Sequence, residues 1–65
     1  MQAYEVISRR VKRTGIPVAE LARRTDIHQV LLGRTLHGER VLKADELIRL
    51  SRELNLQLSD FDEAC

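Results

Sequence analysis

Hydrophobic residues recur every three or four positions along most of this sequence, the spacing that keeps them on one face of an α-helix. Tyr4, Ile7 and Val11 form the first such stripe, and the residues between them are mostly polar. This amphipathic pattern predicts a helix over residues 3–14. Comparable spacing predicts further helices over residues 18–25, 28–37 and 44–54. No segment alternates apolar and polar residues for long enough to predict a strand, so the predicted fold is all-α.

Residues with special backbone preferences separate the predicted helices. Gly15 readily takes the left-handed conformation that ends a helix, and Pro17 suits a helix start because the N–H it lacks has no partner there. Asp26 tolerates the left-handed conformation better than most residues do. A reversal at Asp26 would start the third helix almost at once, at a steep angle to the second. Gly38 is placed to end that third helix, and Asn55 is placed to cap the fourth.

A second hydrophobic stripe lies near the end of the chain. Leu47, Leu50 and Leu54 share one face of the predicted fourth helix. The apolar residues that follow are Leu56, Leu58 and Phe61. They predict a closing turn or short fifth helix packed on the leucine face, and they are also candidates for a dimer interface. Together these elements predict a compact five-helix domain.

The length of 65 residues predicts one small domain over residues 1–65, with a core over about residues 3–61 and an acidic tail, 62–65. The longest apolar run has three residues, far short of the roughly 20 that a membrane span needs. The first residues lack the apolar stretch of a secretion signal. A single cysteine, Cys65, excludes an internal disulfide framework and fits a reducing compartment, so we expect a cytoplasmic protein without a membrane partner.

Groups that could support catalysis or metal binding are sparse. His28 and His37 lie nine positions apart on one predicted helix and do not converge on a metal. A pair between Cys65 and either histidine would require the tail to fold back. Tyr4 and Phe61 are the only aromatic residues, too few for the stacking surface that binds single-stranded nucleic acid. We therefore expect no enzymatic activity, no cofactor and no metal site.

The charges are unevenly distributed, although the formal net charge is only +1. Residues 1–40 carry eight basic and four acidic side chains, a net charge of +4. Residues 41–65 carry three basic and six acidic side chains, a net charge of −3. A basic region can bind phosphates even when the total charge is near zero. A solvated helical surface would show the same distribution, so charge alone leaves both interpretations open.

The predicted third helix has two contrasting faces on a helical wheel of about 100° per residue. The side expected to anchor the helix to the core holds Leu31, Leu32, Thr35 and Leu36. The opposite strip holds Gln29, Val30, Gly33, Arg34 and His37. Glutamine can bond to adenine, arginine to guanine, and a small apolar group can contact a thymine methyl. Gly33 would let the backbone approach a base edge closely. The strip is a candidate for the DNA major groove, but any short surface helix also exposes a polar face.

The segment PVAELARRTDIH, from Pro17 to His28, resembles the opening of the helix-turn-helix of the phage repressor family, which includes the Cro and CI repressors and many bacterial relatives. In that family a Glu-Leu-Ala helix is followed by a turn residue four positions after the alanine, then an apolar residue and the recognition helix. Later residues that match the family pattern are Leu32, Gly38, Leu47, Leu50, Leu54, Asn55 and Leu56. The resemblance covers about residues 3–61.

This resemblance implies a transcriptional regulator, in particular a repressor, that binds double-stranded DNA as a homodimer on a palindromic operator and is nucleoid-associated in the cytoplasm. Its third helix would lie in the major groove. The residues implied to face base edges are Gln29, Val30, Gly33 and Arg34. The residues expected to contact the DNA backbone are Val18, His28, His37, Arg40 and Lys43. His28 has a second interpretation, as an N-terminal cap. We place the dimer surface near Leu56, Leu58 and Phe61, with ordinary core as the alternative.

The sequence departs from the family pattern at several positions. Val18 stands where the family often has glutamine, so only its backbone amide remains to bind a phosphate. Val11 and Leu36 stand where the family often pairs an arginine with a glutamate, which predicts that packing replaces the ion pair. Val30 and Leu31 make the third helix more hydrophobic than usual. They favour a second hypothesis, a protein-interaction module of antitoxin or antirepressor type that uses this helix.

Overall fold

The chain folds into α-helices and a closing 3₁₀ helix in a computed structural model that describes residues 2–64 and the side chains of residues 2–62. The elements are α1 (Ala3–Thr14), α2 (Val18–Thr25), α3 (Gln29–Leu36), α4 (Ala44–Glu53) and the 3₁₀ helix η1 (Leu58–Ala64). No strand occurs within residues 2–64, which confirms the predicted all-α fold with a short fifth helix. Cys65 and the side chains of residues 63 and 64, part of the predicted acidic tail, lie outside the described residues.

The predicted helix breakers occupy the left-handed region of backbone conformation. Asp26 has φ 56° and ψ 38°, and α3 begins only three residues later. Gly15 has φ 73° and donates its amide to the Val11 carbonyl at 3.0 Å, which ends α1. Gly38 and Asn55, with φ 76° and 55°, lie two residues after the ends of α3 and α4, just beyond the C-cap residues His37 and Leu54. Because these residues tolerate a positive φ, the local sequence determines where each helix ends.

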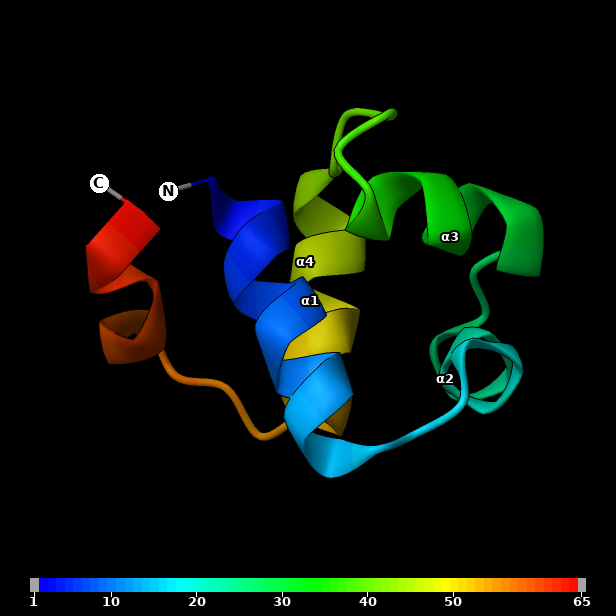
Figure 1. Cartoon of the computed structure of the whole chain (residues 1–65), viewed down its shortest axis with the longest axis horizontal. Coiled ribbons are helices and arrows are strands. Elements are labelled where there is room, and N and C mark those ends of the chain that lie inside the picture. Colours follow the sequence, from blue (N-terminus) through cyan, green and yellow to red (C-terminus); the bar gives the residue numbers. More distant parts are fainter. Residues whose placement is uncertain (1, 65) are drawn as a thin grey trace.

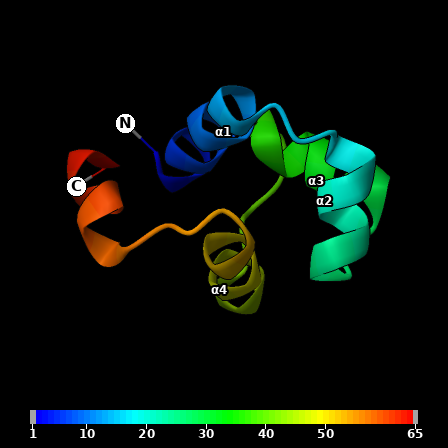
Figure 2. The ribbon, with the colours of Figure 1, turned by 90° about the horizontal axis from the view of Figure 1, so that it is seen from below.

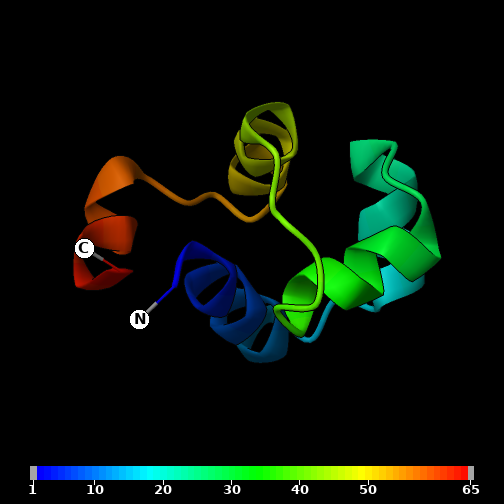
Figure 3. The same ribbon diagram turned by 90° about the horizontal axis from the view of Figure 1, so that it is seen from above.

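Helices α1 and α4 lie between the α2–α3 pair at one end of the molecule and η1 at the other. In Figure 1, α1 and α4 occupy the centre, α3 extends from their upper end, and α2 is seen end-on below α3. Helix α2 packs against α3 and α4, while α1 packs against α3 and η1. Figures 2 and 3 show that η1 lies at one end and the α2–α3 pair at the other. The longest dimension of the fold is 27 Å.

The core receives one completely buried aliphatic residue from each α-helix. These residues are Ile7, Leu21, Leu32 and Leu50. Full burial of one such side chain stabilises a fold by about 1.5–3 kcal/mol. Val11 and Leu36 belong to the same core, as expected if packing replaces the ion pair of the family. All four α-helices therefore depend on one shared cluster.

Two leucines lie outside the core, contrary to the sequence-based prediction. Leu31, expected on the anchoring face of the third helix, is 37% exposed. It lies about 90° around the helix from the centre of the buried face, so it marks the boundary between the two faces. Leu58, expected to pack on α4, is 89% exposed. Leu56 and Phe61 pack against the core in its place and are partly buried.

Two arginines connect elements that are distant in sequence. The Arg10 guanidinium donates to the Leu54 carbonyl at 3.0 Å and lies 3.6 Å from the Asp60 carboxylate, so it connects α1 to the chain around η1. The Arg49 guanidinium donates to the Thr25 carbonyl at 2.9 Å and pairs with Asp45 at 2.9 Å. The bond from Arg49 to Thr25 joins α4 to the last residue of α2, immediately before the turn to α3.

Candidate nucleic-acid interface

The inner face of α3 is held by both apolar and polar contacts. Leu32 and Leu36 are buried in the core, and Thr35 is only 2% exposed. The Thr35 hydroxyl donates to the Leu31 carbonyl at 2.9 Å and accepts from the Arg40 guanidinium at 3.1 Å. An unsatisfied buried hydroxyl would cost about 1–3 kcal/mol, so these two bonds allow a polar group on the buried side. The inner contacts fix which residues of α3 face outward.

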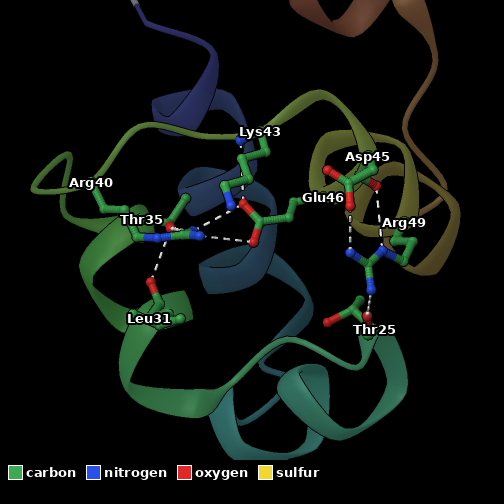
Figure 4. A network of polar contacts seen from close by, with 8 residues as sticks. All are labelled: Thr25, Leu31, Thr35, Arg40, Lys43, Asp45, Glu46 and Arg49. Atoms are coloured by element: carbon green, nitrogen blue, oxygen red, sulfur yellow. Dashed lines mark hydrogen bonds and ion pairs between the residues drawn. The ribbon is translucent and has the colours of Figure 1, made fainter.

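Arg40 and Glu46 join the loop after α3 to the first turn of α4 (Figure 4). The two guanidinium nitrogens of Arg40 donate to the two carboxylate oxygens of Glu46 at 2.9 and 3.1 Å. The Lys43 backbone amide also donates to Glu46, at 3.2 Å. The hydrogen bond from Arg40 is the main cause that lowers the pKa of Glu46, while partial burial acts in the opposite direction. The same bond raises the pKa of Arg40.

The side chain of Arg40, which the sequence predicted to contact a phosphate, makes internal bonds in this structure. Its side chain is 19% exposed and bonds to Thr35 and Glu46. A guanidinium that already bonds two internal partners is poorly placed to neutralise a phosphate. Sequence reasoning missed the partner, Glu46, which is 7% exposed. The only sequence signal was an acidic residue in the first turn of the fourth helix, six positions after Arg40.

A shallow depression of about 330 Å³ lies over the outer face of α3 and the start of α2. The residues that line it are Val18, Gln29, Val30, Gly33, Arg34, His37 and Glu39. The structure thus brings six of the predicted DNA contacts together on one surface, which we call the recognition surface. Gln29, Arg34 and His37 are exposed. Glu39, an acidic residue at the edge, was absent from the sequence prediction. His28, Arg40 and Lys43 do not line the depression.

Histidines lie at both ends of α3. The imidazole Nδ1 of His28 accepts the Val30 backbone amide at 3.2 Å, which confirms the interpretation of His28 as an N-terminal cap. That amide is therefore already bonded within the protein. At the other end, Nδ1 of His37 lies 2.7 Å from the Gly33 carbonyl. This contact holds the exposed imidazole of His37 beside the recognition surface.

The first turn of α2 forms the other border of the recognition surface. Pro17, the residue before the helix, makes no side-chain cap, and Val18 is the first helical residue. Glu20 pairs with Arg23 at 2.6 Å and with Arg24 at 3.5 Å. The hydrogen bond from Arg23 is the main cause that lowers the pKa of Glu20, and it also raises the pKa of Arg23. Glu20 therefore offsets part of the positive charge of α2.

The end of α3 is fixed by contact with the start of α1. A Cβ atom placed on Gly38 would lie 2.5 Å from Cζ of Tyr4, and Gly38 also has a positive φ of 76°. No side chain fits this position without displacing the tyrosine ring. Tyr4 and Gly38 thus complete the support of α3, whose beginning is set by Asp26.

Two helices joined by a tight turn, the second with a buried inner face and an exposed polar outer face, define a helix-turn-helix DNA-binding domain. The family model of the Cro/C1-type HTH DNA-binding domain matches the chain over residues 6–63. The chain belongs to this family, and this assignment supports a DNA-binding transcription regulator whose ligand is double-stranded DNA. No curated protein and no solved structure gives a match to the chain.

The described residues hold no group of three or more His, Cys, Asp or Glu side chains that could bind a metal ion. None of their helices combines the length and the hydrophobicity required to cross a membrane.

Proposed function

We propose that the chain is a repressor that occupies an operator with α3 in the major groove. The observation that carries this proposal is the recognition surface, where Gln29, Val30, Gly33 and Arg34 lie together beside the start of α2. Gln29 and Arg34 would bond to base edges, and Gly33 would let the helix lie deep in the groove. On binding DNA, α3 would keep its position relative to the rest of the domain, because its inner face is anchored in the core.

The DNA backbone would be contacted from the margins of this surface. The amide of Val18, at the uncapped start of α2, would face one phosphate. His37 and Lys43 would add contacts through their exposed side chains. In neutral His28, Nδ1 accepts the hydrogen bond from the Val30 backbone amide, so the imidazole proton is on Nε2. Nε2 could donate this proton to a phosphate. A backbone contact from Arg40 would have to form in addition to its bonds to Thr35 and Glu46.

We infer that the active form is a homodimer on a palindromic operator. A groove of about 840 Å³ lies between the start of α1, α4 and η1, at the end away from α2 and α3. Its apolar lining residues are Leu47, Ile48, Leu56, Leu58 and Phe61. Ile48 is 53% exposed and Leu58 is 89% exposed. Joined there, two copies of a 27 Å fold could place their α3 helices about 34 Å apart, one turn of DNA.

The first test measures affinity for a pool of random duplexes, and for the sequence selected from it, at several salt concentrations. Counterion release predicts that log affinity falls linearly with log salt, with a slope of about −0.9 per phosphate contact. Preference for one sequence should survive at every salt concentration. Binding to duplex DNA that does not change with salt would contradict the proposal.

The rival function, a protein-interaction module, is favoured by one observation, the exposure of Val30 and Leu31 on α3. An apolar contact with a protein partner would change little with salt.

Analytical ultracentrifugation with and without the selected duplex tests the dimer separately. A Leu58→Asp variant should weaken self-association and binding to the full palindrome, while half-site binding stays unchanged.

A further inference from the structure

An aliphatic patch adjoins the polar groups of the recognition surface. It consists of Val30, which lines the depression, and the next residue, Leu31, which does not. Val30 is 57% exposed and Leu31 is 37% exposed, and both lie in the first turn of α3. Within the described residues only three other large hydrophobic side chains are comparably exposed, and none of them is on α2 or α3. The patch borders Gly33, which lacks a side chain, and lies one turn before Arg34.

Nothing in the described part of the fold requires Val30 or Gly33 at its position. A β-branched valine lowers helix propensity, and at this exposure Val30 contributes little burial in return. A Cβ on Gly33 would meet no atom within 4 Å, and no positive φ demands glycine there. The sequence therefore keeps an apolar side chain and a hollow where alanine, glutamine or lysine would form a better surface helix. Such a local conflict with stability is typical of a binding site.

The chemistry of the major groove limits what this patch could contact. Adenine, guanine and cytosine present hydrogen-bond donors and acceptors there, while thymine also presents a C5-methyl group. An aliphatic side chain placed against an amino group or a carbonyl of a base would remove that polar group from water without offering it a hydrogen-bond partner, which is unfavourable. Against a methyl group, the same side chain buries apolar surface on both sides.

We propose that Val30, flanked by Leu31, reads the 5-methyl group of a thymine, so that each half of the operator carries a thymine at a fixed position. This inference rests on the proposed placement of α3 in the major groove. Gly33 supplies the hollow that lets the helix approach the methyl group, and Arg34 reads a neighbouring position through hydrogen bonds. The specificity of this protein then has an apolar component that does not depend on salt.

Replacement of single thymines by 2′-deoxyuridine tests this inference, because the replacement deletes only the methyl group. The full-length protein is titrated with the selected duplex and with duplexes that carry one such replacement in each half-site. One position should lose about three- to fivefold in affinity per half-site, the effect of burying one methyl group. The ratio of thymine to deoxyuridine affinity at that position should stay constant across salt concentrations.

Variants show which residue reads the methyl group. With Val30→Ala, thymine and deoxyuridine should bind equally well at the sensitive position. With Arg34→Lys, the matched control on the same face, the preference for thymine should persist although overall affinity falls. Both residues are exposed, so thermal melting should confirm that both variants fold like the parent.

Two results would overturn the inference. One is that the protein binds duplex DNA in a salt-dependent and sequence-selective way, but no thymine replacement changes its affinity. The proposed function would then stand, and only this inference would fail. The other is a thymine preference that persists unchanged in Val30→Ala. If the protein binds no duplex DNA but captures a partner protein through the same valine, the proposed function and this inference fail together.

Discussion

The two faces of α3 obey different requirements although they belong to one helix of eight residues. The inner face carries Leu32, Thr35 and Leu36, all buried, and its polar atom is fully bonded. The outer face carries Gln29 and Arg34, both exposed, together with an exposed valine and a glycine that packing does not require. The inner face follows the rules of a stable core, whereas the outer face departs from them. Stability and recognition should therefore be separable within this helix.

The separation of stability from recognition within α3 matters because the domain is small. A chain of about 60 residues buries only about 60% of its unfolded surface, so its stability margin is narrow. The inner face cannot lose a large side chain without loss of the fold. Changes on the outer face should alter binding while the melting temperature stays almost constant. The following predictions test this comparison.

The largest effect is expected from Leu32→Ala. Leu32 is completely buried at the centre of the shared core, and its truncation should cost about 2–5 kcal/mol. Urea or thermal unfolding followed by circular dichroism would show a domain that is largely unfolded, and DNA binding would disappear with the fold. Leu31→Ala is the matched control, since its partly exposed side chain should cost much less. Equal destabilisation by the two variants would show that the two faces are not distinct.

Arg34→Ala should have the next largest effect, and on binding only. Loss of a bidentate contact to guanine should reduce affinity for the selected site by about 1–3 kcal/mol and relax the base preference at one position. The melting temperature should be unchanged because Arg34 is exposed. An equal loss on random and selected duplexes would instead identify Arg34 as a phosphate contact.

Gly33→Ala should move stability and binding in opposite directions. A mid-helix glycine costs up to about 1 kcal/mol relative to alanine, and the added Cβ meets no atom within 4 Å. The variant should melt at a higher temperature and bind the operator more weakly, because the methyl group fills the hollow on the recognition surface. A variant that is more stable and binds equally well would show that the hollow is not used.

Glu46→Gln should have the smallest effect at neutral pH, because glutamine keeps an acceptor oxygen for Arg40 and Lys43. The folded-state pKa of Glu46 lies below its ordinary value of 4.5. Its charged form therefore adds stability that is complete above that value and lost as the pH falls through the lower folded pKa. Thermal melts between about pH 7 and pH 2.5 should show a shallower acid decline in the variant than in the parent.

Glu20→Gln is the control for that experiment. Hydrogen bonding also lowers the pKa of Glu20, but its partners, Arg23 and Arg24, lie on the same helix and are exposed. Exposed pairs contribute little to stability, so this variant should follow the parent through acid more closely than Glu46→Gln. Identical acid profiles for all three proteins would show that the Arg40–Glu46 pair does not stabilise the loop.

Helix positions were predictable because the sequence marks them locally. Gly15, Pro17, Asp26 and Gly38 each have a backbone preference that acts within one or two residues. The predicted bounds of the first two helices agree with α1 and α2. The third helix was predicted one residue too long at each end, and the fourth one residue too long at its C-terminal end. The resemblance to the Cro and CI repressors was confirmed by the family match. The roles of the individual site residues stay predictions.

The errors arose where position depends on tertiary packing. The helical wheel could not decide on which side of the boundary Leu31 lies, because it gives direction without the shape of the neighbouring helices. The internal bonds of Arg40 were not foreseen, because they depend on how the loop brings it back to Glu46 and Thr35, which hydrophobic periodicity cannot reveal. Leu58 was expected to pack because it is apolar, but Leu56 and Phe61 are the residues of this segment that pack against the core.

The separation of η1 from the α2–α3 pair also affects how quickly the protein finds its target. Asp60 and Asp62 lie on η1, where Arg10 pairs with Asp60, whereas Arg23, Arg24 and Arg34 lie on α2 and α3, where Glu20 pairs with the first two. If α3 binds DNA as proposed, the remaining asymmetry would exert a torque in the field of the polyanion and turn the molecule before contact, so that most encounters would present α3 first. Moving acidic residues from one end to the other would slow association while every contact in the final complex stayed the same.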